Sequence, residues 1–203
     1  NELANITKIE NFVLLNDEAT GNITLNNANA GAGESIKVDA SALITTNAAT
    51  ISAANEADGL VTIIGGNAGD TITLSASGAG GDTITAGNGD DTINVATANY
   101  TALDIIDGGS GTADNLTLST GGTLSDASFG GTTNVEKLTT ANADTTIIMG
   151  TNAKSAGIKT ISLVTGSNTN SVTLGALFTN DVTVALTDNT DTVQGVSYTG
   201  KAT

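Results

Sequence analysis

Three nine-residue segments between residues 65 and 94 follow one pattern: Gly65-Gly-Asn-Ala-Gly-Asp-Thr-Ile-Thr73, Ser77-Gly-Ala-Gly-Gly-Asp-Thr-Ile-Thr85 and Ala86-Gly-Asn-Gly-Asp-Asp-Thr-Ile-Asn94. Each is a glycine-rich turn that ends in aspartate and continues into a short Thr-Ile segment. They align without gaps, and a longer fourth copy follows as Gly108-Gly-Ser-Gly-Thr-Ala-Asp-Asn-Leu116. Repetition of this kind predicts coils that stack like on like, as in a solenoid.

Segments that alternate small polar and large aliphatic residues occur on both sides of these copies, about ten residues apart. Such alternation predicts short strands, about fifteen in all. It is clearest at 22–25, 35–38, 61–64, 71–74, 92–95, 115–118, 135–138, 146–149, 158–163, 171–174 and 182–186. We interpret residues 97–102 and 152–157 as loop insertions between coils, each with room for one helical turn.

Strands at this spacing also fit a sandwich or a barrel, but two features favour the solenoid. Neighbouring turns resemble one another, and the 203 residues contain no proline. Each coil of a parallel solenoid donates backbone N–H groups to one neighbour and accepts from the other, so proline would break a ladder almost anywhere. The predicted fold is all-β, a parallel β-helix or β-roll. We expect one continuous solenoid over 1–203, with N-terminal coils at 1–64, a repeat block at 65–118 and C-terminal coils at 119–203.

The composition argues against most catalytic and nucleic-acid functions. The chain has 21 acidic and 6 basic residues and a formal charge of -15, which repels nucleic acids and anionic membranes. It has no His and no Cys, so the usual general base, zinc ligands and thiol nucleophile are missing. No apolar run reaches the roughly 18 residues of a membrane span. We expect a non-enzyme. Two carboxylate pairs could in principle cleave a glycoside, Asp39 with Glu56 and Asp188 with Asp191, but we assign them to turns and exposed faces, and the Lys154-Ser155 pair to a solvated loop.

The repeated turns suit a hard cation. Glycine lets a turn fold so that several carbonyl oxygens point inward, and aspartate adds a charged oxygen. Calcium takes about six to eight oxygen ligands. Ordinary turn chemistry is the alternative, because aspartate also caps its own backbone. Three gapless copies within 30 residues of an acidic, cysteine-free chain favour calcium over that alternative.

The pattern resembles the nonapeptide G-G-x-G-x-D-x-U-x of the repeats-in-toxin (RTX) family, a calcium-binding β-helix repeat. The resemblance implies that each ion lies between two turns on the same side of the roll. It would therefore pair the turn of Asp70 with that of Asp91, and the turn of Asp82 with that of Asp114. The implied ligands are Asp70, Asp82, Asp91 and Asp114 with Gly66, Asn67, Gly80, Gly87, Asn88, Gly89, Gly109 and Gly111.

Two further aspartates, Asp90 and Asp107, are either additional ligands or solvated side chains. The chain also departs from the family pattern. Ala68 replaces the glycine at position four, and Ser77 and Ala86 replace the first glycine, which would weaken binding if their carbonyl groups are misplaced.

The four motif aspartates are unevenly spaced, by 12, 9 and 23 residues, so we expect an insertion near Tyr100 to interrupt the coil. The resemblance further implies that the aliphatic residue after each turn points into the core and that its threonine neighbours face outward. These aliphatic residues are Ile72, Ile84, Ile93 and Leu116.

Two segments outside the repeat block, Asn5-Ile-Thr-Lys-Ile-Glu-Asn11 and Thr133-Asn-Val-Glu-Lys-Leu-Thr139, resemble each other and are similar to segments of bacterial surface-layer proteins. Those proteins combine Thr-rich and Asn-rich solenoids with RTX-like blocks. The resemblance implies a secreted structural component at the bacterial cell surface that self-associates into a sheet or filament, with cell-surface polysaccharide as a further partner. The alternative is an adhesin or binding module, or the RTX region of a larger secreted enzyme or toxin.

Overall fold

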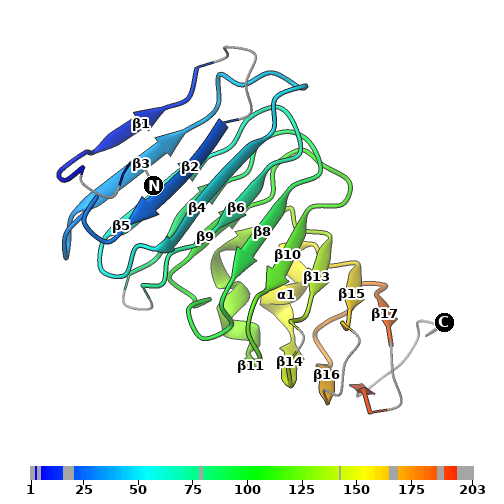
Figure 1. The fold of residues 1–203 in the computed structure, drawn as a ribbon. Coiled ribbons are helices and arrows are strands. Elements are labelled where there is room, and N and C mark those ends of the chain that lie inside the picture. Colours follow the sequence, from blue (N-terminus) through cyan, green and yellow to red (C-terminus); the bar gives the residue numbers. More distant parts are fainter. Residues whose placement is uncertain are drawn as a thin grey trace.

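The chain forms a nearly all-β, parallel solenoid of about seven turns (Figure 1), which confirms the predicted fold class. The computed structural model describes residues 3, 6–15, 21–77, 80–141, 143–164, 169–186 and 190–195. Every strand pairing among these residues is parallel, so each strand of a sheet comes from a different coil.

The largest sheet has eight strands and crosses the whole front of the molecule in Figure 1. In spatial order its strands are β17 (Thr183–Ala185), β15 (Thr160–Ser162), β13 (Lys137–Thr139), β10 (Asn115–Leu118), β8 (Thr92–Val95), β6 (Thr71–Thr73), β4 (Ala49–Asn55) and β2 (Gly21–Asn26). It therefore includes strands from the N-terminal coils, the repeat block and the C-terminal coils.

Two smaller sheets form the other sides. The six-stranded sheet contains β1 (Asn11–Val13), β3 (Ser35–Asp39), β5 (Leu60–Ile64), β7 (Thr83–Thr85), β9 (Ile105–Asp107) and β12 (Thr132–Thr133). The four-stranded sheet contains β11 (Gly122–Leu124), β14 (Thr145–Met149), β16 (Asn170–Leu174) and β18 (Thr192–Gly195).

The core consists of aliphatic side chains that stack on their equivalents in the next coil. In the eight-stranded sheet one fully buried column runs through Ile51, Ile72, Ile93, Leu116, Leu138 and Ile161, which pair in register. The residues on either side of these positions face outward and are mostly threonine, because side chains alternate between the two faces of a strand. The predicted inward positions are confirmed, since Ile72, Ile84, Ile93 and Leu116 are all buried.

The segment around Tyr100 does not interrupt the coil, contrary to the expectation from the aspartate spacing. Strands β8 and β10 pair in register across it, as do β7 and β9. The Tyr100 ring is buried and packs edge-on against Phe129 at a centroid distance of 5.6 Å. The extra residues thus fill the interior, where an aromatic pair widens the narrow aliphatic core.

The expected helical turn near residue 152 is the short helix α1 (Thr151–Ala156), which packs beside the 3-10 helix η1 (Asp126–Gly131). Asp126 holds the start of α1, because its Oδ1 accepts the N–H groups of Gly150 at 2.7 Å and Ala153 at 2.9 Å. Gly157 ends the helix with a φ of 100°. Within the described ranges no helix has the length and apolar character needed to cross a membrane.

Truncation of one stacked aliphatic side chain tests this arrangement. Ile72→Ala should lower the free energy of unfolding by about 2–5 kcal/mol, because the cavity cannot collapse between two flanking coils. Thr73→Ala, one residue further on the outward face, should change it by less than about 1 kcal/mol. Urea denaturation measures both, and equal losses would contradict the assignment of the two faces.

Candidate functional site

One acidic residue lies immediately before each of four successive strands of the eight-stranded sheet. The register of β6, β8, β10 and β13 aligns Asp70, Asp91, Asp114 and Glu136, and we call these four residues the acid column. The same register places Ala49 before the column and Lys159 after it. Equivalent positions in neighbouring coils are about 4.8 Å apart, so the four carboxylates form a continuous stack.

The first oxygen of each carboxylate replaces a backbone ladder acceptor. Asp70 Oδ1 accepts the N–H of Ala49 at 2.6 Å, and Asp91 Oδ1 accepts that of Asp70 at 2.6 Å. Asp114 Oδ1 accepts the N–H of Asp91 at 2.8 Å, and Glu136 Oε2 accepts that of Asp114 at 3.2 Å. The side chains therefore continue the hydrogen-bond ladder at this corner of the eight-stranded sheet.

The second oxygens differ from one another. At one end Asp70 Oδ2 accepts the N–H of Gly66 at 2.5 Å, and at the other end Glu136 Oε1 lies 3.7 Å from the Lys159 ammonium. In the middle, Asp91 Oδ2 and Asp114 Oδ2 are buried and have no hydrogen-bond partner. The residues themselves are 1% and 0% exposed. The column is thus closed at both ends by protein donors and open between Asp91 and Asp114.

The glycine turns that precede these aspartates stack more closely than any side chain permits. Gly87 and Gly109 have φ values of 112° and 92°, which favour glycine. A Cβ on Gly87 would lie 2.2 Å from the Gly66 carbonyl oxygen, and one on Gly109 would lie 2.0 Å from that of Gly87. Backbone bonds join the turns: Asn88 N–H donates to Gly66 at 3.0 Å and Ser110 N–H donates to Gly87 at 2.8 Å. Glycine is therefore required for the stacking itself.

A second acidic pair lies at a different corner, before the strands of the six-stranded sheet. The N–H of Asp82 donates to Asp104 Oδ1 at 2.9 Å. Asp82 Oδ2 accepts the N–H of Ser75 at 2.7 Å, and its Oδ1 is 3.1 Å from the Ser75 hydroxyl. Asp104 Oδ2 accepts the N–H of Thr101 at 2.7 Å. All four carboxylate oxygens of this pair therefore have partners within the protein.

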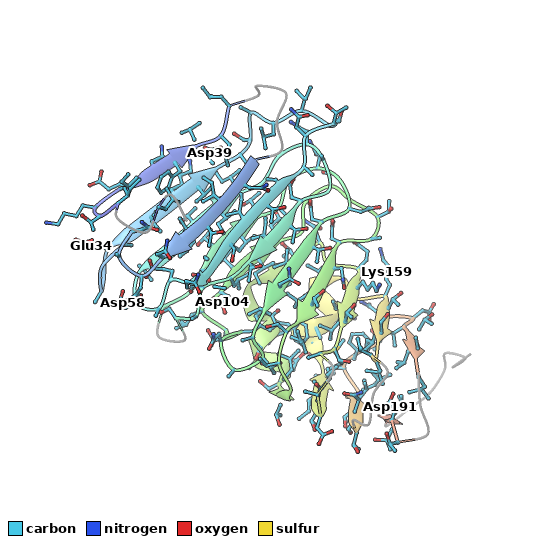
Figure 2. All side chains as sticks on the ribbon, in the orientation of Figure 1. Glu34, Asp39, Asp58, Asp104, Lys159 and Asp191 are labelled. Carbon is cyan, nitrogen blue, oxygen red and sulfur yellow. The ribbon has the colours of Figure 1, made fainter. Side chains whose placement is uncertain are left out.

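The two corners lie apart, as the positions of Asp104 and Lys159 in Figure 2 show. The expected neighbourhood of Asp70 and Asp91 is confirmed. The expected pairing of Asp82 with Asp114 is wrong, because Asp114 stacks on Asp91 and Asp82 stacks on Asp104. The physical reason is that the residues around Tyr100 belong to the coil, so the fourth repeat returns to the same side as the third.

Glu136 and Asp104 were not predicted from the sequence. Glu136 follows Asn134-Val135, and Asp104 follows Ala102-Leu103, so neither ends a glycine-rich turn. The only sequence signal is position, because each acid directly precedes a strand, as Asp70 and Asp91 do.

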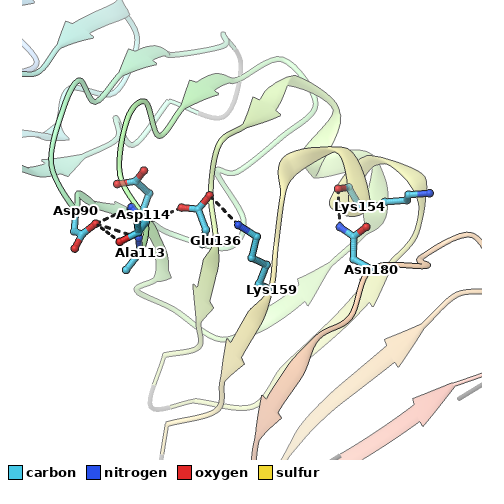
Figure 3. Close-up of polar contacts among 8 residues, drawn as sticks. Asp90, Ala113, Asp114, Glu136, Lys154, Lys159 and Asn180 are labelled. Carbon is cyan, nitrogen blue, oxygen red and sulfur yellow. Dashed lines mark hydrogen bonds and ion pairs between the residues drawn. The ribbon is translucent and has the colours of Figure 1, made fainter. Parts of the chain in front are cut away.

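The other predicted ligands mostly hold the turns together. Asn67 Oδ1 accepts from the Asn88 amide at 2.6 Å, which extends the stack of turns. Asp90 is exposed, and its Oδ1 accepts the N–H of Thr112 at 2.8 Å. The same oxygen accepts the N–H of Ala113 at 3.1 Å (Figure 3). Asp107 Oδ1 accepts the N–H of Gly109 at 3.0 Å. Asp90 and Asp107 are thus hydrogen-bonded rather than merely solvated.

The remaining glycines of the predicted set contact their neighbours closely. A Cβ on Gly89 would lie 2.5 Å from the Gly69 nitrogen, and one on Gly111 would lie 2.6 Å from either Asp114 carboxylate oxygen. Gly80, by contrast, lies at the other corner. A Cβ built on Gly80 would lie 2.3 Å from Cδ2 of the exposed Leu60 side chain. Gly80 is therefore not part of the stack of turns that precedes the acid column.

Burial perturbs the acids of both corners. Burial, reinforced by the charges of Asp70, Asp114 and Asp90, raises the pKa of Asp91 to about 7. Burial also raises the pKa values of Asp70 and Asp114. At the second corner, burial and the nearby Asp104 raise the pKa of Asp82 to about 6. Negative charge is therefore disfavoured at both corners, and most at Asp91.

The acid column fits a hard cation in part. Two buried carboxylate oxygens without partners, on adjacent coils, are a donor set that calcium favours. Among the described residues, however, no three His, Cys, Asp or Glu side chains are grouped closely enough to hold a metal. Asp91 and Asp114 would therefore share a cation with backbone carbonyl oxygens and water, as flexible calcium sites allow.

Of the carboxylates considered for catalysis, Asp188 lies outside the described residues, and Asp39, Glu56 and Asp191 have partners within the protein. Asp39 lies 2.9 Å from the Lys37 ammonium, and the Ser41 hydroxyl is the main cause that lowers the pKa of Asp39 to about 2. Glu56 is buried in a turn, where its Oε1 accepts the N–H of Gly59 at 3.0 Å. The Ser155 hydroxyl donates to the Thr151 carbonyl at 3.0 Å. Each of these side chains therefore has a partner within the protein, although Glu56 Oε2 is buried without one.

Comparison with known proteins finds no family model, no curated protein and no solved structure that matches the chain.

The raised pKa values predict how stability depends on pH when divalent cations are removed. Asp91 and Asp82 bind a proton more tightly in the folded chain than an unfolded aspartate, whose pKa is about 3.9. Their contribution to stability is complete below about pH 4 and is lost as the pH rises through about 6 to 7. The melting temperature in chelator should fall by several degrees between pH 5 and pH 8. Asp91→Asn should flatten that slope, and a melting temperature that rises with pH would contradict the assignment.

Proposed function

We propose that the chain is a structural segment of a bacterial extracellular assembly, a surface layer or filament, in which calcium bound at the acid column stabilises and stiffens the solenoid. The observation that carries the calcium proposal is the open middle of the column, where Asp91 Oδ2 and Asp114 Oδ2 are buried without partners. Buried polar atoms normally have a hydrogen bond, so two adjacent exceptions call for an explanation.

A cation resolves the electrostatic problem of the column. Two ionised carboxylates about one coil apart, removed from water, repel each other and lose their hydration. A divalent ion between their free oxygens offsets both the repulsion and the lost hydration, whereas protonation of Asp91 offsets them only below about pH 7. The chain has a formal charge of -15 and only 6 basic residues, so it has few internal cations to take this role.

The solenoid architecture supports a structural role. Parallel ladders join every coil to the next through the repeat block, and the aliphatic column Ile51–Ile161 runs beside them. A cation at Asp91 and Asp114 would join the coils of β8 and β10, which lie in the middle of that run. Binding there would also couple folding to calcium concentration, since the paired site exists only in the stacked chain.

Calcium should raise the stability of the chain. A ligand that binds only the folded state contributes about 2.7 kcal/mol at a hundredfold excess over its dissociation constant. Thermal melts followed by circular dichroism, with calcium and with chelator at pH 8, should differ by about 5–10 °C. Asp91→Asn should abolish the difference.

The matched control is Asp82→Asn, which removes a buried charge whose oxygens already have protein donors. This variant should keep the calcium response. Identical melts of the unsubstituted chain with and without calcium would refute calcium binding at the column.

Assembly is tested separately by electron microscopy of the purified chain with calcium. Sheets or filaments support the structural role. Dispersed particles at every protein concentration would instead support a binding module or the RTX region of a larger secreted protein.

A further inference from the structure

We propose that Lys159 is a built-in counter-ion that closes the acid column and prevents Glu136 from becoming a calcium ligand. This inference rests on the proposed calcium binding at Asp91 and Asp114. In this role one lysine sets how many divalent cations the acid column binds.

The register puts Lys159 at the next position of the column. Thr160 pairs with Lys137, so Lys159 aligns with Glu136 in the same way that Glu136 aligns with Asp114. The N–H of Lys159 donates to the Glu136 carbonyl at 2.8 Å, which fixes its backbone one coil further along. Four acids in line are thus followed by one cation, as Figure 3 shows for Asp114, Glu136 and Lys159.

The ammonium meets the one oxygen of Glu136 that the backbone leaves free. Glu136 Oε2 accepts the N–H of Asp114, while Oε1 lies 3.7 Å from Lys159 Nζ. The Glu136 side chain is 17% exposed and the Lys159 side chain 67% exposed, so the pair forms at the surface end of the buried stack. The ion pair gives Glu136 the partner that Asp91 and Asp114 lack.

Without Lys159 the acid column would have a second pair of neighbouring carboxylates with free oxygens. Glu136 Oε1 would join Asp114 Oδ2 as a free oxygen on the adjacent coil, repeating the relation between Asp91 and Asp114. With Lys159 present, a divalent ion at this step would lie about one coil from a unit positive charge. At that separation the repulsion between the two cations weakens calcium binding by at least about tenfold, even at the dielectric constant of bulk water.

Stability alone is a weak readout of this role, because exposed ion pairs change stability little. The number of bound ions responds directly. Calcium bound per chain should be measured by equilibrium dialysis and elemental analysis of the full 203-residue chain, for the unsubstituted protein and for Lys159→Gln. The Lys159→Gln chain should bind one more calcium ion, or its weakest calcium site should bind the ion about tenfold more tightly.

Lys154 provides a matched control. It is exposed on α1, and it makes no ion pair with any residue that the structure describes; its carbonyl accepts from the Asn180 amide at 3.0 Å (Figure 3). Lys154→Gln removes the same charge and should leave the calcium count of the unsubstituted chain. Equal binding by Lys159→Gln and Lys154→Gln, with calcium bound to both, would overturn the role of Lys159 while leaving the proposed function in place.

Two further variants complete the test. Glu136→Gln combined with Lys159→Gln should return the count to that of the unsubstituted chain, because Glu136 supplies the added ligand. Glu136→Gln alone should not change the count, and a lost ion in that variant would overturn the inference even if Lys159→Gln does not fold. Absence of calcium from every variant would overturn this inference and the calcium proposal together.

Discussion

Coils of a parallel solenoid stack in register, so a residue at a given position meets its equivalent in the next coil about 4.8 Å away. For isoleucine and leucine this repetition gives a continuous dry column. For a carboxylate it brings like charges together in a region that excludes water, which disfavours the ionised form. In the Asp70–Glu136 stack, backbone N–H groups donate to one oxygen of each acid. The second oxygen has a partner within the protein at Asp70 and Glu136 but not at Asp91 or Asp114.

The two oxygens of each carboxylate therefore have different roles, one in the backbone ladder and the other in binding a further partner. The first oxygens continue the backbone ladder at the corner of the eight-stranded sheet. The second oxygens vary, from the Gly66 N–H at one end to the Lys159 ammonium at the other. Within the acid column, only Asp91 and Asp114 combine a ladder role with an oxygen that the protein leaves without a partner.

Local patterns in the sequence predicted much of the fold and part of the site. The alternation in 71–74 and 92–95 identified β6 and β8, but β4 was not singled out because alanine fills two of its three buried positions, Ala49 and Ala53. The glycine-rich turns led to Asp91 and Asp114. Glu136 escaped notice because it lies outside such a turn, although it holds the same position in its coil.

The sequence by itself determined the parallel β-solenoid, the inward aliphatic residues and the turn aspartates, because each depends on residues that are close together in the chain. Only the tertiary structure decided which acids are neighbours. Successive steps of the column span 21, 23 and 22 residues, so no fixed sequence period relates its members. The loops between the strands accommodate these differences in length. Because the backbone ladder fixes the register at the strands and not along the chain, it aligns Asp91 with Asp114 and Glu136 with Lys159.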